Sequence, residues 1–177
     1  MYLTEHFGLS LGALVIWGFM MAFFFNIFLY FATPKKSACL LFTSFIMFAS
    51  YFSSDSFFSW FSTTETYLHW ALWDIATFVI ILCFVLFNKP MHKPPAYYYV
   101  AIGLILNSIL FLLIYYDIYI KYNKDPWLLW DIYSFGVNIV DFTMIVALIV
   151  DRDILGLIKL KNGIKALFKG QQVKHTA

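Results

Sequence analysis

Charged residues are scarce in this sequence, and their scarcity excludes most classes of soluble protein. Asp, Glu, Lys and Arg make up only 12% of the 177 residues, whereas hydrophobic residues make up 62%. A soluble domain is about a quarter charged and about half apolar. Because a domain of about this size leaves about 30% of its unfolded surface exposed, one core cannot hide the excess apolar surface. The composition therefore predicts an integral membrane protein and excludes soluble enzymes, disordered chains and disulfide scaffolds.

The sequence also lacks the motifs of common catalytic and cofactor sites. Cys39 and Cys83 lie in apolar segments and form no C-x-x-C pair, so no redox or thiolate metal site is predicted. There is no G-x-S-x-G, H-E-x-x-H or P-loop sequence. Glu65 and His69 stand four residues apart but supply only two metal ligands. We therefore expect a protein that is not an enzyme and holds no cofactor or metal. The net charge of +2 is too small to predict binding to nucleic acid.

Five apolar segments are long enough, or nearly long enough, to cross a bilayer. A helix needs about 20 apolar residues to span about 30 Å of hydrocarbon. Prolines, lysines and polar stretches separate the segments and end the helices. The predicted fold is an all-α membrane helix bundle over residues 1–150, followed by a basic amphipathic tail over residues 151–177. The spans are predicted at residues 8–32, 38–54, 67–87, 96–120 and 126–150.

Basic residues predict the orientation of the bundle. With five spans, ten of the twelve Lys and Arg residues fall on one side, leaving Lys121 and Lys124 on the other. Positive residues collect on the cytoplasmic side, so the N-terminus is expected outside and the C-terminus inside. The first residues lack the basic segment of a cleavable signal peptide. A composition rich in Phe, Ile, Tyr and Lys favours a bacterial inner membrane. The tryptophans expected at the outer interface are Trp60, Trp70, Trp73, Trp127 and Trp130.

An internal repeat relates two of the predicted spans. Residues 69–78 (HWALWDIATF) align without gaps on residues 126–135 (PWLLWDIYSF), with six of the ten positions identical. The identical positions include two tryptophans and the aspartates Asp74 and Asp131. We interpret the repeat as a duplicated helix hairpin, in which spans two and three recur as spans four and five. The alternative is that W-x-L-W-D is merely how two helices enter an aromatic belt.

Polar residues on the fifth span are the first candidate site. A carboxyl group at the bilayer centre costs about 2.5 to 3.5 kcal/mol, so it faces protein or water rather than lipid. Asp141 lies just past the middle of this span. Asp131, Ser134 and Asn138 precede it at spacings that place all four on one helix face. That face is predicted to turn away from lipid.

Other spans supply partners for this face. Asn107 lies near the centre of span four, and Asp74 lies about two turns inside span three. A carboxyl group beside an Asn amide is stable in hydrocarbon when it is protonated and hydrogen-bonded. Acidic residues at the span ends are interpreted as solvated boundary residues, namely Asp55, Asp117, Asp151 and Asp153.

Two functions fit these polar residues. In the first, they fix helix register at about 0.6 kcal/mol per contact. The chain is then a non-enzymatic structural or sensing subunit that self-assembles or docks a membrane or cytoplasmic partner. In the second, a proton or cation path runs from Asp131 to Asp141, and the chain is a small proton- or ion-coupled transporter or channel.

The tail has a pattern of its own. Apolar residues from Leu157 to Leu167 form one helical stripe beside a basic stripe of Lys161, Lys165 and Lys169. This pattern is typical of a basic amphipathic helix on an anionic lipid surface. Two alternatives are a simple positive anchor and a docking helix for a cytoplasmic partner.

Overall fold

A computed structural model describes most of the chain but only residues 151–153 and 156 of the tail. The tail lysines Lys161, Lys165 and Lys169 lie outside the described residues, as does Trp60. The structure describes residues 2–32, 37–58, 66–88, 93–123, 125, 127–153 and 156, with their side chains except those of residues 2–10 and 55–58.

Within these ranges every regular element is helical, which confirms the all-α prediction. Each predicted span forms one helix. The first helix begins at Tyr2 rather than at residue 8, and the second continues to Phe58 rather than ending at residue 54. The helices are α1 (Tyr2–Ala32), α2 (Ala38–Phe58), α3 (Thr66–Phe87), α4 (Pro95–Tyr115) with the π-helical turn η1 (Tyr116–Ile120), and α5 (Leu128–Val150).

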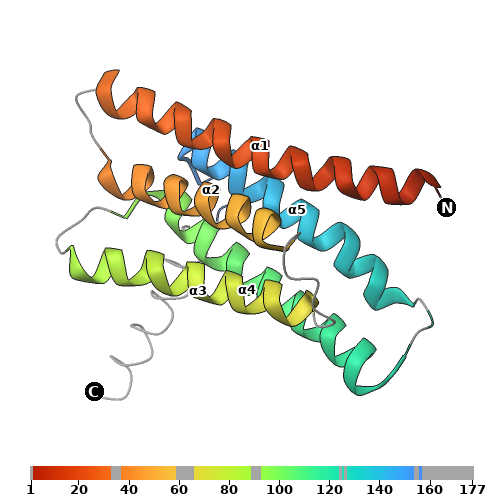
Figure 1. Ribbon diagram of the computed structural model, residues 1–177. Helices are drawn as coiled ribbons and strands as arrows, with labels where there is room; N and C mark the ends of the chain where they lie inside the picture. Colours follow the sequence, from red (N-terminus) through yellow and green to blue (C-terminus); the bar gives the residue numbers. More distant parts are fainter. Residues whose placement is uncertain are drawn as a thin grey trace, which may run out of the picture.

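The helices of the described segments close into a ring (Figure 1). Each helix packs on the next one in the chain, and α5 packs back on α1. Successive helices run in opposite directions, so α1 and α5 lie side by side and parallel. One end of the bundle therefore combines the first halves of α1, α3 and α5 with the last halves of α2 and α4 (Figure 1).

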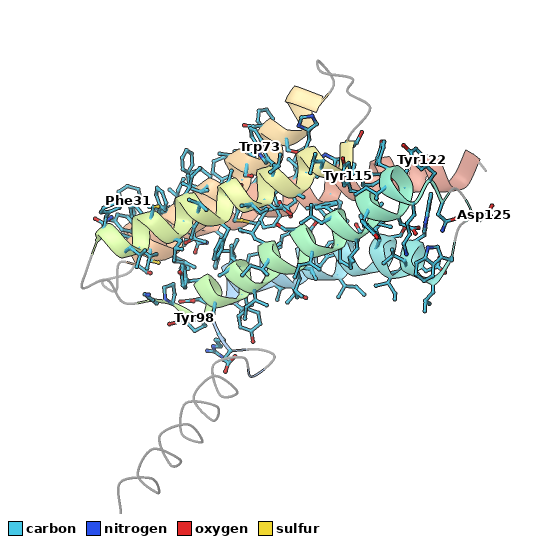
Figure 2. All side chains as sticks on the ribbon, turned by 90° about the horizontal axis from the view of Figure 1, so that it is seen from below. Phe31, Trp73, Tyr98, Tyr115, Tyr122 and Asp125 are labelled. Carbon is cyan, nitrogen blue, oxygen red and sulfur yellow. The ribbon has the colours of Figure 1, made fainter. Side chains whose placement is uncertain are left out.

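The outer surface of the bundle is apolar. Phe135 is 71% exposed, and Phe31 at the end of α1 is 77% exposed. Figure 2 shows Phe31 at one end of the bundle and Tyr122 with Asp125 at the other. Four helical stretches in the described part are long and apolar enough to cross a bilayer, while the apolar part of α2 is shorter. The chain is therefore a multi-pass membrane protein. The four stretches are Leu11–Ala32, Thr66–Phe87, Pro95–Ile120 and Leu128–Val150, and the shorter one is Ala38–Ser54.

Small residues bring the second half of α5 close to its neighbours. A Cβ atom added to Gly18 of α1 would lie 2.6 Å from Cδ1 of Ile145. A Cβ atom added to Gly103 of α4 would overlap the sulfur of Met144. Close approach of backbones is a main source of packing energy between membrane helices, because lipid supplies no hydrophobic force between them.

The two halves of α5 pack differently. Its buried residues begin at Asp141 and continue to Leu148, whereas none of residues 128–140 is fully buried. Nδ2 of Asn26 in α1 donates to the carbonyl of Leu148 at 3.0 Å. This carbonyl is in the last turn, where the helix itself offers no donor. The end of α5 is therefore fixed to α1 and α4, while its beginning packs loosely and leaves space inside the bundle.

Candidate functional site

Asp141 joins three helices at one carboxyl oxygen. Oη of Tyr51 in α2 donates to Oδ1 of Asp141 at 2.6 Å, and Nδ2 of Asn107 in α4 donates to the same oxygen at 2.7 Å. Asp141 is 5% exposed, and Asn107 is fully buried. The structure thus brings together Asn107 and Asp141 as the sequence predicted, and it adds Tyr51. Because both donors use Oδ1, they leave Oδ2 unoccupied.

Asp74 of α3 is a second buried carboxyl group. It is 6% exposed, and its Oδ2 atom is buried without a hydrogen-bond partner among the described residues. A buried polar atom without a partner costs about 1 to 3 kcal/mol. The described residues hold three more such atoms, Oδ1 of Asn26, Oγ1 of Thr43 and Oδ1 of Asn107, but Asp74 is the one carboxyl group among the four.

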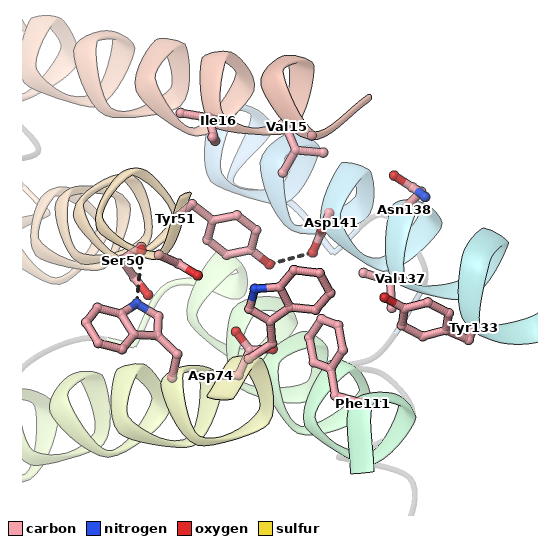
Figure 3. Close-up of a pocket in the computed structure, with 14 residues that line it drawn as sticks. Val15, Ile16, Ser50, Tyr51, Asp74, Phe111, Tyr133, Val137, Asn138 and Asp141 are labelled. Atoms are coloured by element: carbon pink, nitrogen blue, oxygen red, sulfur yellow. Dashed lines mark hydrogen bonds between the residues drawn. The ribbon is translucent and has the colours of Figure 1, made fainter. Parts of the chain in front are cut away.

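Both carboxyl groups line one partly open cavity (Figure 3). Its volume is about 240 Å³, and it lies at the end of the bundle where α5 packs loosely. Figure 3 shows Asp74 and Asp141 approaching it from α3 and α5, with Tyr51 of α2 beside them. Val15 of α1 and Phe111 of α4 also line the cavity, so each of the five described helices contributes to its wall. None of the lining residues, all of them described, is Lys, Arg or His.

Three rings form a continuous side of this cavity, which we call the aromatic wall (Trp70, Phe111 and Tyr133). The ring centroids of Trp70 and Phe111 are 5.5 Å apart, and those of Phe111 and Tyr133 are 5.8 Å apart. The three residues come from α3, α4 and α5. Aromatic faces carry partial negative charge and attract cations. The aromatic wall and the two carboxyl groups therefore favour the same sign of charge.

Hydrogen bonds between α2 and α3 fix the position of Asp74. Nε1 of Trp73 donates to the backbone carbonyl of Ser50 at 2.9 Å. One turn further along α3, the hydroxyl groups of Thr77 and Ser50 bond at 2.5 Å. These contacts stand on either side of Asp74 in the sequence. The backbone of Asp74 is therefore held by its neighbours, although its own carboxyl group lacks a full set of partners.

The polar face predicted on α5 is divided. Asp131 and Ser134 are exposed, Asn138 is half-buried at the cavity, and Asp141 is buried. Nδ2 of Asn138 donates to the carbonyl of Ser134 at 2.6 Å, within the same helix. At about 100° per residue the four residues span only about 80°, so the division follows position along α5: the two exposed residues lie in its loosely packed first turns, and Asp141 lies where its neighbours close around it. Asp131 and Ser134 therefore lie outside the cavity lining, whereas Asp74 lines the cavity together with Asn138 and Asp141.

Asp117 is buried, so its interpretation as a solvated boundary residue is wrong. It lies in η1 and is 3% exposed. Its Oδ2 atom accepts hydrogen bonds from Nε1 of Trp127 at 2.8 Å and from Nε1 of Trp130 at 3.2 Å. Nδ2 of Asn123 donates to the same oxygen at 3.2 Å. These bonds tie the connection between α4 and α5 to the end of α4, and we call the four residues the Asp117 cluster.

Asp151 and Asp153 tie the end of α5 to the start of α4. The backbone N–H of Ala96 donates to Oδ1 of Asp151 at 3.3 Å, and Oη of Tyr99 donates to Oδ1 of Asp153 at 2.9 Å. Ala96 lies in the first turn of α4, where backbone N–H groups lack helical acceptors and favour negative charge. Both aspartates are half-buried rather than simply solvated. The side chain of Asp55 lies outside the described residues.

The cavity offers ligands for a cation but not for a zinc-type metal. In the part of the chain that the structure describes, no three His, Cys, Asp or Glu side chains stand together. Structural zinc sites use four such ligands. The chemistry available in the cavity is therefore the binding of positive charge and the exchange of protons at carboxyl groups.

No known protein family, curated protein or solved structure matches the chain.

Sequence reasoning missed Tyr51 and underrated Asp74. Ser50, Tyr51 and Ser54 are polar residues near the end of the shortest apolar segment. Their side chains interrupt its apolar sequence. That interruption is the signal that could have identified a cavity wall. For Asp74 the signal was weaker, because its neighbours Trp70 and Trp73 fit a lipid interface equally well.

Proposed function

We propose that this protein is a non-enzymatic membrane subunit that senses a small ligand in the cavity between Asp74 and Asp141. The observation that carries the proposal is that Asp74 lines a cavity of about 240 Å³ and has a buried Oδ2 atom with no partner among the described residues. Carboxyl groups that serve only to fix helix register are expected to have their oxygens paired. A bound ligand would supply the missing partner.

Packing at the opposite end of the bundle supports a site that opens on one side only. There Met144 and Leu148 are buried, and Asn26 bonds to the end of α5. Phe42 of α2 and Phe84 of α3 stack with ring centroids 3.6 Å apart. A sensing subunit needs access from one side, whereas a carrier needs access from both sides in turn. With the N-terminus outside, the cavity opens toward the exterior.

Thiol labelling tests this access. In a Cys39→Ala, Cys83→Ala background, Ser54→Cys places a thiol in the cavity lining, and Thr43→Cys places one at a buried control position in α2. We expect a membrane-impermeant maleimide to label position 54 from outside only and position 43 from neither side. Labelling of position 54 from both sides would overturn the sensing subunit, and labelling from neither side would contradict an accessible cavity.

A proton- or ion-coupled transporter or channel is the second candidate. Its support is that two carboxyl groups from different helices, Asp74 and Asp141, share one cavity. Flux of protons or alkali ions in proteoliposomes tests it. The candidate requires wild-type flux that Asp141→Asn abolishes while the protein still elutes as wild type in size exclusion. Absence of wild-type flux contradicts it.

The remaining parts of the proposal concern placement and assembly. We propose a bacterial inner membrane with the N-terminus outside and the C-terminus in the cytoplasm, on the distribution of Lys and Arg. In the same cysteine-free background, Gln172→Cys should react with the impermeant reagent only after lysis. We further propose a duplicated hairpin and assembly with a second copy or a protein partner, for which Asp131 and Ser134 are exposed polar groups on α5.

A further inference from the structure

We propose that the ligand of the cavity is a small organic ammonium ion, with Asp74 as its counter-ion and the aromatic wall as its apolar contact. The inference deepens the proposed function and rests on it. Its starting point is the composition of the lining: two carboxyl groups line the cavity, and none of the described lining residues has a basic side chain. An anion would find no basic side chain among these lining residues to pair with.

The two carboxyl groups have different roles in this site. Asp141 already accepts hydrogen bonds from Tyr51 and Asn107 at 2.6 and 2.7 Å, which hold it in place. Asp74 has a buried oxygen without a partner among the described residues. A cation in the cavity would gain a charge-assisted contact with the Asp74 carboxyl group, which lines it. Asp74 is therefore the binding group, and Asp141 is a positioning residue that shapes the opposite wall.

The aromatic wall selects an organic cation over a metal ion. Trp70, Phe111 and Tyr133 present rings 5.5 and 5.8 Å apart along one side of the cavity. Such rings replace water around an alkylammonium group at low cost, as in the aromatic cages that hold quaternary ammonium ligands. Metal ions prefer several oxygen, nitrogen or sulfur ligands. The described residues bring only two acidic groups to this cavity and no cluster of three metal-binding side chains.

The size of the cavity limits the ligand. Sites for drug-sized ligands begin at about 300 Å³, and this cavity holds about 240 Å³. The ligand is therefore a short amine or a small quaternary ammonium compound rather than a large amphiphile. The hydroxyl groups of Ser50 and Ser54 also line the cavity and can accept from an ammonium or a ligand hydroxyl group.

Ligand titration of the full-length protein in detergent tests the proposal. The probes are choline, its uncharged isostere 3,3-dimethylbutan-1-ol, and sodium or potassium chloride, all at constant ionic strength. The readouts are tryptophan fluorescence, since Trp70 and Trp73 line the cavity, and the unfolding temperature. We expect saturable changes with choline but not with the isostere or the alkali salts. A response to an alkali salt as strong as that to choline would overturn the organic class.

Matched variants assign the response to the cavity. Asp74→Asn should weaken choline binding at least tenfold, whereas Asp131→Asn, the same change at an exposed position of α5, should leave it unchanged. Phe111→Leu keeps an apolar side chain but removes a ring of the aromatic wall, and it should weaken binding about threefold to tenfold. Equal binding by wild type and Asp74→Asn would overturn the assignment of the counter-ion.

The outcomes separate this inference from the proposed function. If choline does not bind while Ser54→Cys is labelled from outside only, the ammonium ligand is wrong and the one-sided sensing site stands. If Ser54→Cys is labelled from neither side, both proposals fail. If choline binds and also accumulates inside proteoliposomes in a manner that Asp74→Asn abolishes, the ligand class is supported and the sensing subunit is replaced by a carrier.

Discussion

The two W-x-L-W-D segments carry the same residues into different surroundings. In α5 the indoles of Trp127 and Trp130 donate to Asp117 at the end of α4. In α3 the indole of Trp73 donates to the carbonyl of Ser50 in α2. In both segments an indole N–H thus ties its helix region to the preceding helix of the chain. The tryptophans therefore have a shared structural role, whether or not the segments arose by duplication.

The aspartates of the two segments differ. Asp74 is 6% exposed and lines the cavity, whereas Asp131 is exposed at the loosely packed start of α5. The same motif therefore provides a candidate binding group in one helix and a surface group in the other. What decides between them is how closely the surrounding helices pack at that point. Four sets of substitutions test this comparison.

Asp117→Leu is expected to have the largest effect. It would leave the indole N–H groups of Trp127 and Trp130 and the amide of Asn123 without the carboxyl group that accepts from all three. These donors are exposed or half-buried, so water replaces part of what is lost. Because three hydrogen bonds to one carboxyl group are lost together, we expect a clear fall in the free energy of unfolding, measured by denaturation in mixed micelles. Asp131→Leu is the control and should change stability by less than about 0.5 kcal/mol. Equal losses in the two variants would contradict the Asp117 cluster.

Asp141→Leu should destabilise the bundle by about 2 to 4 kcal/mol, because it leaves the donors of Tyr51 and Asn107 unpaired. Asp141→Asn should stay within about 1 kcal/mol of wild type, since both donors use Oδ1 and an Asn side chain keeps that oxygen. The same denaturation assay compares them. Equal losses in the Asn and Leu variants would show that Oδ2 of Asp141 also stabilises the fold.

Asp74→Leu should raise the free energy of unfolding by about 1 to 2 kcal/mol in the absence of ligand. The substitution removes a buried oxygen that has no partner among the described residues and fills part of the cavity. The gain in stability should come with the loss of choline binding, as expected when a site is kept for function rather than stability. A destabilised variant would show that Asp74 is a paired structural residue.

Trp73→Phe should have the smallest effect, a loss of about 1 kcal/mol. It removes one hydrogen bond to Ser50 but keeps an aromatic ring. Trp130→Phe removes one of the donors to Asp117 and should cost a similar amount. Melting curves of the two variants compare the hairpin contacts directly. A difference of more than about 2 kcal/mol between them would show that the tryptophans do not share a role.

Helix positions were predictable from the sequence because they depend on local properties. The start of α4 at Pro95 and the end of α3 at Phe87 lie within one residue of the predicted bounds, since prolines and lysines mark those ends. The start of α1 was missed by six residues. Polar side chains such as Thr4 and Glu5 are compatible with a helix that extends beyond the apolar stretch, and hydropathy does not register them.

The site was less predictable because it depends on which helices meet. The pairing of Asn107 with Asp141 followed from depth, since both lie near the bilayer centre. The burial of Asp117 did not, because its partners lie in the next helix and in the connection between the two. The exposure of Asp131 was also missed, since periodicity gives the width of a polar face but not the part of it that neighbours cover.

The π-helical turn at the end of α4 has a consequence for chain length. Its wider hydrogen bonds, such as the 3.0 Å bond from the N–H of Lys121 to the carbonyl of Tyr116, enclose one residue more than an α-helical bond does. A homologue lacking one residue between 116 and 120 would form a plain α-helix there and turn the following side chains by about 100°. Its two tryptophans would then need another acceptor in place of Asp117. A single-residue deletion in this turn should therefore occur in evolution together with replacement of Trp127 and Trp130.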